Sequence, residues 1–175
     1  GVGNLGEPIS VRALEVSAEG ALVCEVSAFQ LWSTAFFPAE VSVITNIAED
    51  HLDYFEGDFQ RYRGAKERLA YLCALTGGLT LTPHQLTLSE GAPRDLPSSL
   101  KPSLKHFGIR ARSGDSSPSL ALELYVERGQ LMDGEAQLAD LSSAPLIGRH
   151  NQLNICVALL ALRELGLPVH EALSG

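Results

Sequence analysis

Short apolar runs alternate with polar and glycine-rich segments along the chain, and each run has the length of a β-strand. Residues 21–24 are all apolar and predict a buried strand over 21–25, parallel to its neighbours. Residues 41–44, apolar except for Ser42, form a second run and predict a strand over 41–46. Three further strands are expected, at 79–81, 104–109 and 119–126.

Two longer segments have the apolar period of a helix. The first covers residues 58–75, with Asp58 as its N-cap and the glycines at 77–78 as its end. The apolar stripe of this helix follows spacings of three and four residues and comprises Phe59, Tyr62, Leu69 and Cys73. The second helix is predicted to open at Asn151 as N-cap and to end before Gly166.

Between the last strands and the last helix, the residues Arg128-Gly129-Gln130 predict a hairpin turn. The chain is expected to return from Leu131 as an antiparallel strand. Together these elements predict an α/β fold, a mostly parallel sheet flanked by helices, with a small antiparallel ribbon. A length of 175 residues suits a single domain with one sizeable core.

Composition narrows the class of protein. Apolar residues make up 45% of the chain, which excludes a disordered or fibrous protein. No apolar run approaches the roughly 18 residues of a membrane span, and no basic leader precedes an apolar stretch. We therefore expect a cytoplasmic protein with no membrane partner.

The net charge and the cysteine content argue against nucleic-acid binding, a disulfide framework and a zinc site. The net charge of -8 argues against a nucleic-acid partner, and it suits anionic substrates only if cations or a local basic group bridge them. The cysteines Cys24, Cys73 and Cys156 are far apart, each in an apolar segment. They predict buried free thiols in a reducing compartment, not a disulfide framework or a zinc site.

Polar groups follow the first two predicted strands where each strand ends. Glu25 closes the first strand, with Ser27 and Gln30 just behind it. The second strand leads into a turn with four potential cation ligands, namely Glu49, Asp50, His51 and Asp53. Ligands of open α/β sheets bind at the carboxyl ends of the strands, so this turn and Glu25 predict a site. Helix capping or simple solvation is the alternative role for Glu25.

Lys66 interrupts the apolar stripe of the helix over 58–75. A buried lysine is costly unless it is paired, deprotonated or modified. The alternative is that its aliphatic stem packs while the ammonium group reaches solvent. A neighbouring cluster of carboxylates and a histidine would favour a functional role.

The first six residues match the pattern G-x-G-x-x-G, and Glu25 follows about twenty residues later. This is a partial dinucleotide-binding fingerprint, but the pattern requires a preceding strand that the printed sequence does not contain. A glycine-rich turn before a short helix, with Pro8 near its first turn, is the alternative.

Near the end of the chain, Asn151 and Asn154 lie three residues apart and on one helix face. An asparagine amide can donate and accept at once, as an adenine edge requires. Helix capping by Asn151 and simple exposure of Asn154 are the alternative roles.

Taken together, five motifs resemble the Mur ligases in order and spacing. They are G-x-G-N-x-G, E-V-S-A-F-Q-L, T-N-I-x-x-D-H-L-D, Y-x-x-A-K-x-R-L and G-x-H-N-x-x-N. That family uses ATP to join amino acids to a UDP-muramoyl substrate in bacterial cell-wall synthesis. The S-A-F-Q-L segment is most similar to the members that add D-glutamate. The resemblance extends from Gly1 to about Gly166 and implies the fold of a P-loop NTPase-like central domain.

The resemblance implies a role for each matching residue. ATP and Mg²⁺ would be the cofactors, with UDP-N-acetylmuramoyl-L-alanine and D-glutamate as substrates of a monomeric enzyme. Glu25 and His51 would each bind a magnesium ion, and Lys66 would carry a carbamate and complete the catalytic and metal-binding set. Asn4, Ser27 and Gln30 would contact the muramoyl substrate. Asn151 and Asn154 would contact adenine.

The match departs from the family pattern in two respects. The family has a G-x-x-G-K-[ST] phosphate loop shortly before the segment that matches Gly1, and this sequence contains no such loop. The chain is therefore expected to be a partial central domain, without that loop and without the terminal domains. Ala28 also replaces the second serine of the usual S-S-F-Q-L.

Three other interpretations remain open at this point. The chain can belong to a ligase of the same superfamily that adds another amino acid or folate glutamates. It can instead be a nucleotide-binding module without catalysis. The third, an NAD-binding role for the first glycines, explains none of the later motifs.

Overall fold

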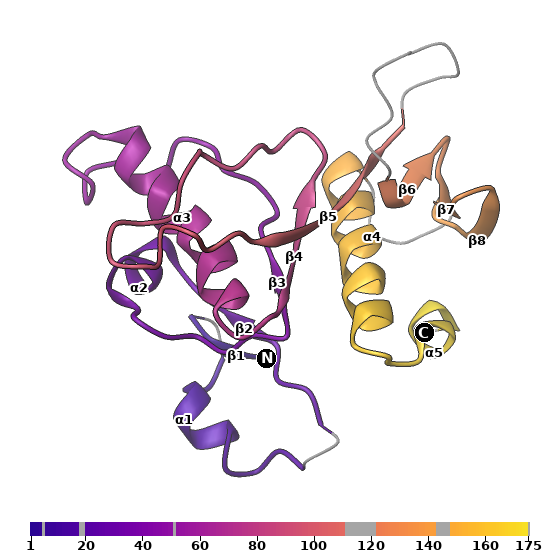
Figure 1. Cartoon of the computed structure of the whole chain (residues 1–175). Helices are drawn as coiled ribbons and strands as arrows, with labels where there is room; N and C mark the ends of the chain where they lie inside the picture. The colour runs from indigo at the N-terminus through magenta and orange to yellow at the C-terminus, as the bar shows by residue number, and fades with distance from the viewer. Residues whose placement is uncertain (5, 18–19, 51, 111–121, 143–147, 175) are drawn as a thin grey trace.

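The computed structural model describes residues 1–4, 6–17, 20–50, 52–110, 122–142 and 148–174 (Figure 1). Its strands are β1 (Val2–Gly3), β2 (Cys24–Glu25), β3 (Val41–Val43), β4 (Leu79–Pro83), β5 (Ser103–Ile109), β6 (Leu122–Glu127), β7 (Gln130–Asp133) and β8 (Ala136–Asp140). Its helices are α1 (Ile9–Arg12), α2 (Ala28–Ser33), α3 (Phe59–Ala74), α4 (Arg149–Glu164) and α5 (Val169–Ser174). None of the helices in these ranges combines the length and the apolar character needed to cross a lipid bilayer.

The main sheet has six strands in the order β3-β4-β5-β6-β7-β8. The first four are parallel, and β7 and β8 extend the sheet as an antiparallel ribbon. Arg128 and Gly129 both have positive φ, 51° and 81°, which suits the tight turn between β6 and β7. The predicted fold class, including the hairpin and the small ribbon, is confirmed, although residues 119–121 of one predicted strand lie outside the described ranges.

One face of the main sheet is covered by α4, which lies against β5 and β6 in Figure 1. The core between them is apolar and includes Leu81, Phe107, Leu124, Leu131, Cys156 and Leu160, each at most 1% exposed. Burying one such large side chain contributes about 1.5–3 kcal/mol. Burial also raises the pKa of the Cys156 thiol to about 12, which keeps it protonated.

The opposite face of the sheet is polar beneath α3. Ser42 and Thr80 share a hydrogen bond of 2.8 Å between their hydroxyl oxygens. The hydroxyl of Thr82 lies 3.0 Å from Nδ1 of His106 on β5. These cross-strand pairs satisfy polar groups that are buried, since Thr80 and Thr82 are both 0% exposed.

Helix α3 has the boundaries that its sequence predicts. The carboxylate of Asp58 accepts from the backbone N–H groups of Gln60 and Arg61, at 2.8 and 3.2 Å. Gly77, with φ of 77°, follows the helix end. Among the cysteines, Cys73 and Cys156 are buried as expected, whereas Cys24 is only half-buried; all three are free thiols.

Two buried charged residues of α3 connect the helix to its surroundings. The Arg68 guanidinium donates to the carbonyl of Thr34 and to the carboxylate of Asp95. Glu67 accepts from Arg63 Nε at 2.7 Å and from the backbone N–H of Ser89 at 3.1 Å. These contacts fix the end of α2 and the segment after β4 to α3, and they satisfy the buried charges.

A separate two-stranded parallel sheet is formed by β1 and β2. The predicted strand over 21–25 is wrong in its extent, because only Cys24–Glu25 pairs and Val23 is 76% exposed. The strand predicted over 41–46 is likewise limited to Val41–Val43. Among the described residues, β2 pairs only with β1, and β3 pairs only with β4. Each strand therefore forms backbone hydrogen bonds along one edge, which limits its length.

The glycine-rich start of the chain is not a strand-to-helix phosphate turn. Val2 and Gly3 are themselves strand β1, and α1 begins at Ile9 with Pro8 as its N-cap residue. The short helix of the predicted alternative, with Pro8 at its start, is therefore confirmed, whereas Gly3 lies in a strand and not in a turn. The dinucleotide-binding interpretation lacks the geometry it requires.

Candidate active site

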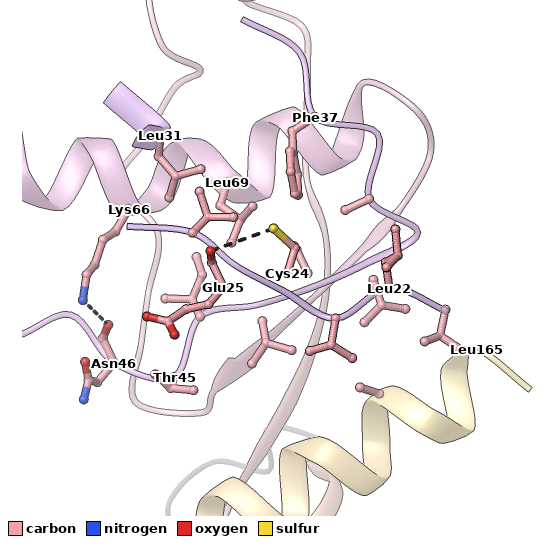
Figure 2. A pocket seen from close by; sticks show the side chains of 18 residues that line it. Leu22, Cys24, Glu25, Leu31, Phe37, Thr45, Asn46, Lys66, Leu69 and Leu165 are labelled. Carbon is pink, nitrogen blue, oxygen red and sulfur yellow. Dashed lines mark hydrogen bonds between the residues drawn. The ribbon is translucent and has the colours of Figure 1, made fainter. Parts of the chain in front are cut away.

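A cavity of about 560 Å³ separates the β1–β2 pair from the main sheet (Figure 2). Strand β2 forms one wall of it and β3 the other. Most of its lining is apolar and comes from Leu22, Val23, Leu31, Phe37, Val41, Val43, Ile44, Leu69 and Leu165. Its polar lining comes chiefly from Glu25, Thr45, Asn46 and Lys66. Glu25 ends β2, Thr45 and Asn46 follow β3, and Lys66 belongs to α3.

Asn4 and Glu25 are brought together by the pairing of β1 with β2. The Asn4 backbone N–H donates to the Glu25 carbonyl at 2.8 Å, and its Nδ2 donates to Glu25 Oε1 at 3.2 Å. Gly3 allows this close approach, since its φ is 101° and a Cβ there would overlap the Glu25 carbonyl oxygen. The glycine run thus orients an amide against a carboxylate at the cavity.

Lys66 reaches the same polar end from α3. Its Nζ donates to the Asn46 carbonyl at 3.4 Å and lies 5.1 Å from the centre of the Tyr62 ring. Figure 2 shows the Lys66 and Glu25 side chains entering the cavity from different elements. The lysine in the apolar stripe therefore faces a cavity with polar groups, as a functional role requires.

The predicted magnesium site includes one residue outside the described ranges, because His51 is not among the residues that the structure places. Within those ranges, no group of three or more histidine, cysteine, aspartate or glutamate side chains is placed so that it could hold a metal ion. Among the residues that the structure places, only Glu25 offers a carboxylate to the cavity. This fits the usual chemistry of Mg²⁺, which commonly binds one or two carboxylates together with substrate phosphates and water.

Ser27 and Gln30 lie at the start of α2, immediately after β2, but not in the cavity lining. Ser27 is the N-cap, and its side chain forms a capping box with that of Gln30. Both predicted substrate-contacting residues therefore also have a structural role, which the motif S-x-x-Q could have indicated.

An aromatic cluster holds α2 against α3 beside the site. Ala28, Phe55, Tyr62 and Ala65 are its buried members. Phe29 adds to it, with its ring centre 5.9 Å from that of Phe55. Ala28 is 7% exposed, so the residue that departs from the usual serine faces this apolar cluster.

Asn151 and Asn154 lie in the first two turns of α4, away from the cavity lining. The prediction that Asn151 caps the helix is wrong, because the N-cap is Gly148 with φ of 112°. A glycine in that conformation lets the helix begin one turn earlier. The part of α4 that reaches the cavity is its other end, because the cavity lining includes Ala161 and Leu165.

His84, near the start of α4, is a partly buried polar residue that the sequence patterns did not indicate. It follows β4 directly, and its Nδ1 is buried without a hydrogen-bond partner in the described part of the chain. Its ring occupies the space that a Cβ at Gly108 would need. Burial lowers the pKa of His84, and nearby His106 and Arg149 lower it further. A histidine shortly after a predicted strand was the available signal.

Comparison with known proteins adds an independent observation. A family model described as the Mur ligase middle domain matches residues 4–162. The UDP-N-acetylmuramoylalanine–D-glutamate ligase of Chlorobium phaeobacteroides is 30% identical, over 99% of this chain and 39% of that protein. The proteins of the same name from Chlorobium luteolum and Streptococcus equi are each 31% identical, over 95% and 93% of this chain. The chain spans 36% and 33% of those two proteins, so it matches little more than a third of these relatives.

Proposed function

This chain belongs to the Mur ligase family, and we propose that it is the central ATP-binding part of a D-glutamate-adding ligase. The complete enzyme would join D-glutamate to UDP-N-acetylmuramoyl-L-alanine in peptidoglycan synthesis, in the cytoplasm and as a monomer. The main support is that Glu25 and Lys66 line one cavity from different elements, with Asn4 hydrogen-bonded to the Glu25 carboxylate. The names of the relatives support the choice of amino acid.

The proposed reaction proceeds through an acyl phosphate. The γ-phosphoryl group of ATP moves to the carboxylate of the muramoyl substrate, and ADP leaves. The D-glutamate amine then attacks the acyl carbon, phosphate departs and an amide bond remains. Such transfers depend on positioning and on neutralising phosphate charge, and bound Mg²⁺ would supply that neutralisation.

Glu25 and His51 would each hold a magnesium ion. Asn4 supports this role for Glu25, because its Nδ2 donates to Oε1 and holds the carboxylate in one orientation. The second carboxylate oxygen, Oε2, is then available to a cation at the cavity.

Lys66 would act as a carbamate. A positively charged ammonium group at this position would repel a cation held by Glu25, whereas a carbamate would attract it. The aliphatic stem of Lys66 packs among apolar residues, and its Nζ already meets the polar end of the cavity at Asn46. A carbamate there would be a ligand or an orienting group beside the phosphates.

The remaining predicted residues would bind the two large substrates. Asn4, Ser27 and Gln30 follow β1 and β2 and would contact the UDP-muramoyl substrate. Asn151 and Asn154, at the start of α4, would contact adenine.

We further propose that the functional protein is longer than this chain. The chain covers 39% or less of the relatives compared. Strands β2 and β3 face each other across an apolar cavity, each with an edge unpaired in the described part of the chain. A strand leading into a phosphate-binding loop would fit there, and the 175 residues alone are expected to have no ligase activity.

The test is ADP release by the complete protein with UDP-N-acetylmuramoyl-L-alanine and a panel of amino acids. The proposal predicts that D-glutamate stimulates release at least about 10²-fold more than L-alanine, L-lysine or meso-diaminopimelate. Stimulation by another amino acid would identify a different Mur ligase. No stimulation by any of them would favour a nucleotide-binding module without catalysis.

A further inference from the structure

A second cavity, of about 600 Å³, lies between α2, α3 and the segment 89–95. It shares no lining residue with the cavity of the proposed active site. Its volume is within the range of small-molecule sites in proteins. One wall is a single face of α3, whose lining residues follow spacings of three and four. They include Gln60, Gly64, Glu67, Arg68 and Tyr71.

The segment opposite α3 is anchored at both of its ends. At one end, the Tyr71 hydroxyl donates to the Ser89 carbonyl at 3.3 Å, and the Ser89 N–H donates to Glu67 Oε1 at 3.1 Å. At the other end, the Arg68 guanidinium donates to the Asp95 carboxylate at 2.7 Å. The three α3 side chains are each at most 7% exposed. The cavity therefore has a defined wall on this side and is not a gap beneath a free loop.

Gly64 leaves the middle of the α3 wall without a side chain. A Cβ built at this position would meet no other atom within 4 Å, so no neighbour requires a glycine there. Its φ is not among the positive ones, so the backbone does not require a glycine either. Glycine in a helix interior is less stable than alanine or leucine. The space above Gly64 thus fits an occupant that approaches the helix backbone closely.

The lining carries one charge that the described part of the chain does not balance. Arg68 pairs with Asp95. Glu67 pairs with Arg63, at 2.7 Å. The exposed guanidinium of Arg94, in contrast, makes no hydrogen bond or ion pair with the described residues. Because an arginine fork binds a carboxylate through two parallel hydrogen bonds, the rim of the cavity suits one carboxylate.

Trp32 supplies an aromatic surface to the same cavity. Its side chain is 43% exposed, which is unusual for so large an apolar group. Phe55 meets it edge to face at 5.7 Å between ring centres, and the Arg61 guanidinium lies 5.4 Å from its ring centre. These contacts hold the indole in place while part of it stays accessible. A ligand ring can pack against that accessible part.

We propose that this cavity is a second binding site, for a small aromatic molecule that bears a single carboxylate. The ring would pack against Trp32 in the space above Gly64, and the carboxylate would pair with Arg94. A phosphate group is less suitable, because its second charge would be repelled by the Glu67 and Asp95 carboxylates. The site lies outside the proposed active site, so the inference does not depend on which amino acid the ligase adds.

The experiment is an NMR titration of the complete protein, labelled at tryptophan, with hydrocinnamate, a phenyl ring on a short flexible carboxylate. Trp32 is the only tryptophan of the 175 residues, and the signal that disappears in Trp32→Phe identifies its indole N–H. We expect hydrocinnamate to shift this signal in a saturable manner. The neutral hydrocinnamamide should bind at least about 10-fold more weakly, because it cannot form the ion pair.

Two substitutions test the two ends of the site. Arg94→Ala should weaken hydrocinnamate binding at least about 10-fold, whereas Lys101→Ala, which removes the same charge at an exposed residue outside the lining, should not. Gly64→Leu should weaken binding by a similar factor because it fills the cavity. It should also raise the unfolding temperature, since leucine is the better helix former. Arg94 is exposed, so its variant decides the test whatever Gly64→Leu does to folding.

The absence of a saturable shift of the Trp32 signal would overturn the inference. Equal affinity for hydrocinnamate and its amide would do the same, as would wild-type affinity of the Arg94→Ala variant. Each of these results leaves the proposed function untouched, because D-glutamate-dependent ADP release is a separate measurement.

Discussion

The two sides of the cavity differ in how they are stabilised. The main sheet packs fully buried side chains such as Phe107 and Leu131 against α4. The β1–β2 pair has few paired residues, and its apolar side chains Leu22 and Val23 are 37% and 76% exposed. Most of the proposed catalytic and substrate-binding groups nevertheless belong to the second region or to the segments facing it. The packing of the main sheet thus stabilises the fold. Under the proposed function, the β1–β2 side would supply the chemistry, and a strand from outside this chain would pair with its free edge.

The largest expected effect is on the free energy of unfolding, and it should differ between the main-sheet core and the β1–β2 side of the cavity. Phe107→Ala should lower the free energy of unfolding by about 3–5 kcal/mol, because it leaves a cavity in the closed core. Val23→Ala should change it by less than about 0.5 kcal/mol, since that side chain is exposed. Urea unfolding of this chain measures both. Equal losses would show that the open side is as tightly packed as the core.

A second test compares this chain with the complete protein by hydrogen–deuterium exchange. Backbone amides of residues 21–26 and 39–46 should exchange about 10-fold or more slowly in the complete protein, because a further strand would pair with both edges. Exchange in β5 and β7 should be nearly unchanged. Identical exchange of residues 39–46 in both proteins would contradict the proposed occupant of the cavity.

A smaller effect is expected at the charge network that joins α4 to β5. Burial raises the pKa of Glu164, but the hydrogen bond and charge of Lys105 and the charge of Arg163 lower it more, so the net shift is downward. Because the pKa of Glu164 is lower in the folded state, its ionised carboxylate stabilises the fold. This stabilisation is fully present above the ordinary pKa of 4.5 and is lost as pH falls through the folded-state pKa.

Glu164→Gln should accordingly cost about 1 kcal/mol at pH 7 and little near pH 3. Chemical denaturation across this pH range measures the difference. The exposed Glu135→Gln is the matched control and should show no such dependence. A Glu164→Gln cost that does not change with pH would exclude the ion pair as its cause.

The smallest effect is expected at Ala28, where the usual family residue is serine. Ala28→Ser would place a hydroxyl against the aromatic cluster and should destabilise the protein by at most about 1 kcal/mol. Substrate affinity should not change, because this side chain faces the buried cluster and not the cavity. A clear gain of affinity on calorimetric titration would show that the missing hydroxyl is a substrate contact.

Sequence patterns predicted the elements that depend on local chemistry. Asp58 marked the start of α3, and the residues around Gly129 marked the hairpin. Lys66, which interrupts the apolar stripe of α3, lines the cavity, while its predicted role stays a prediction. In each case the signal is contained within a few neighbouring residues.

Features that depend on distant partners were predicted less well. The apolar run 21–24 has the composition of a buried strand, but a strand extends only as far as it finds partners, and here it pairs with β1 at two positions. The start of α4 was misplaced because Asn151 is a good cap by composition, whereas Gly148 takes that position. The burial of His84 against Gly108 requires two strands to be neighbours, which the local sequence does not encode.

The central claim is that catalysis takes place at the polar end of the cavity, beside Lys66. The most direct test is to measure D-glutamate-dependent ADP release by the Lys66→Ala variant of the complete ligase. We expect a loss of about 10²–10³-fold with little change in unfolding temperature, and partial rescue by small carboxylic acids. Lys101→Ala, at an exposed lysine outside the cavity lining, should retain wild-type activity. Wild-type ADP release by Lys66→Ala would contradict the account, because Lys66 would then be only a packing residue at the edge of the cavity.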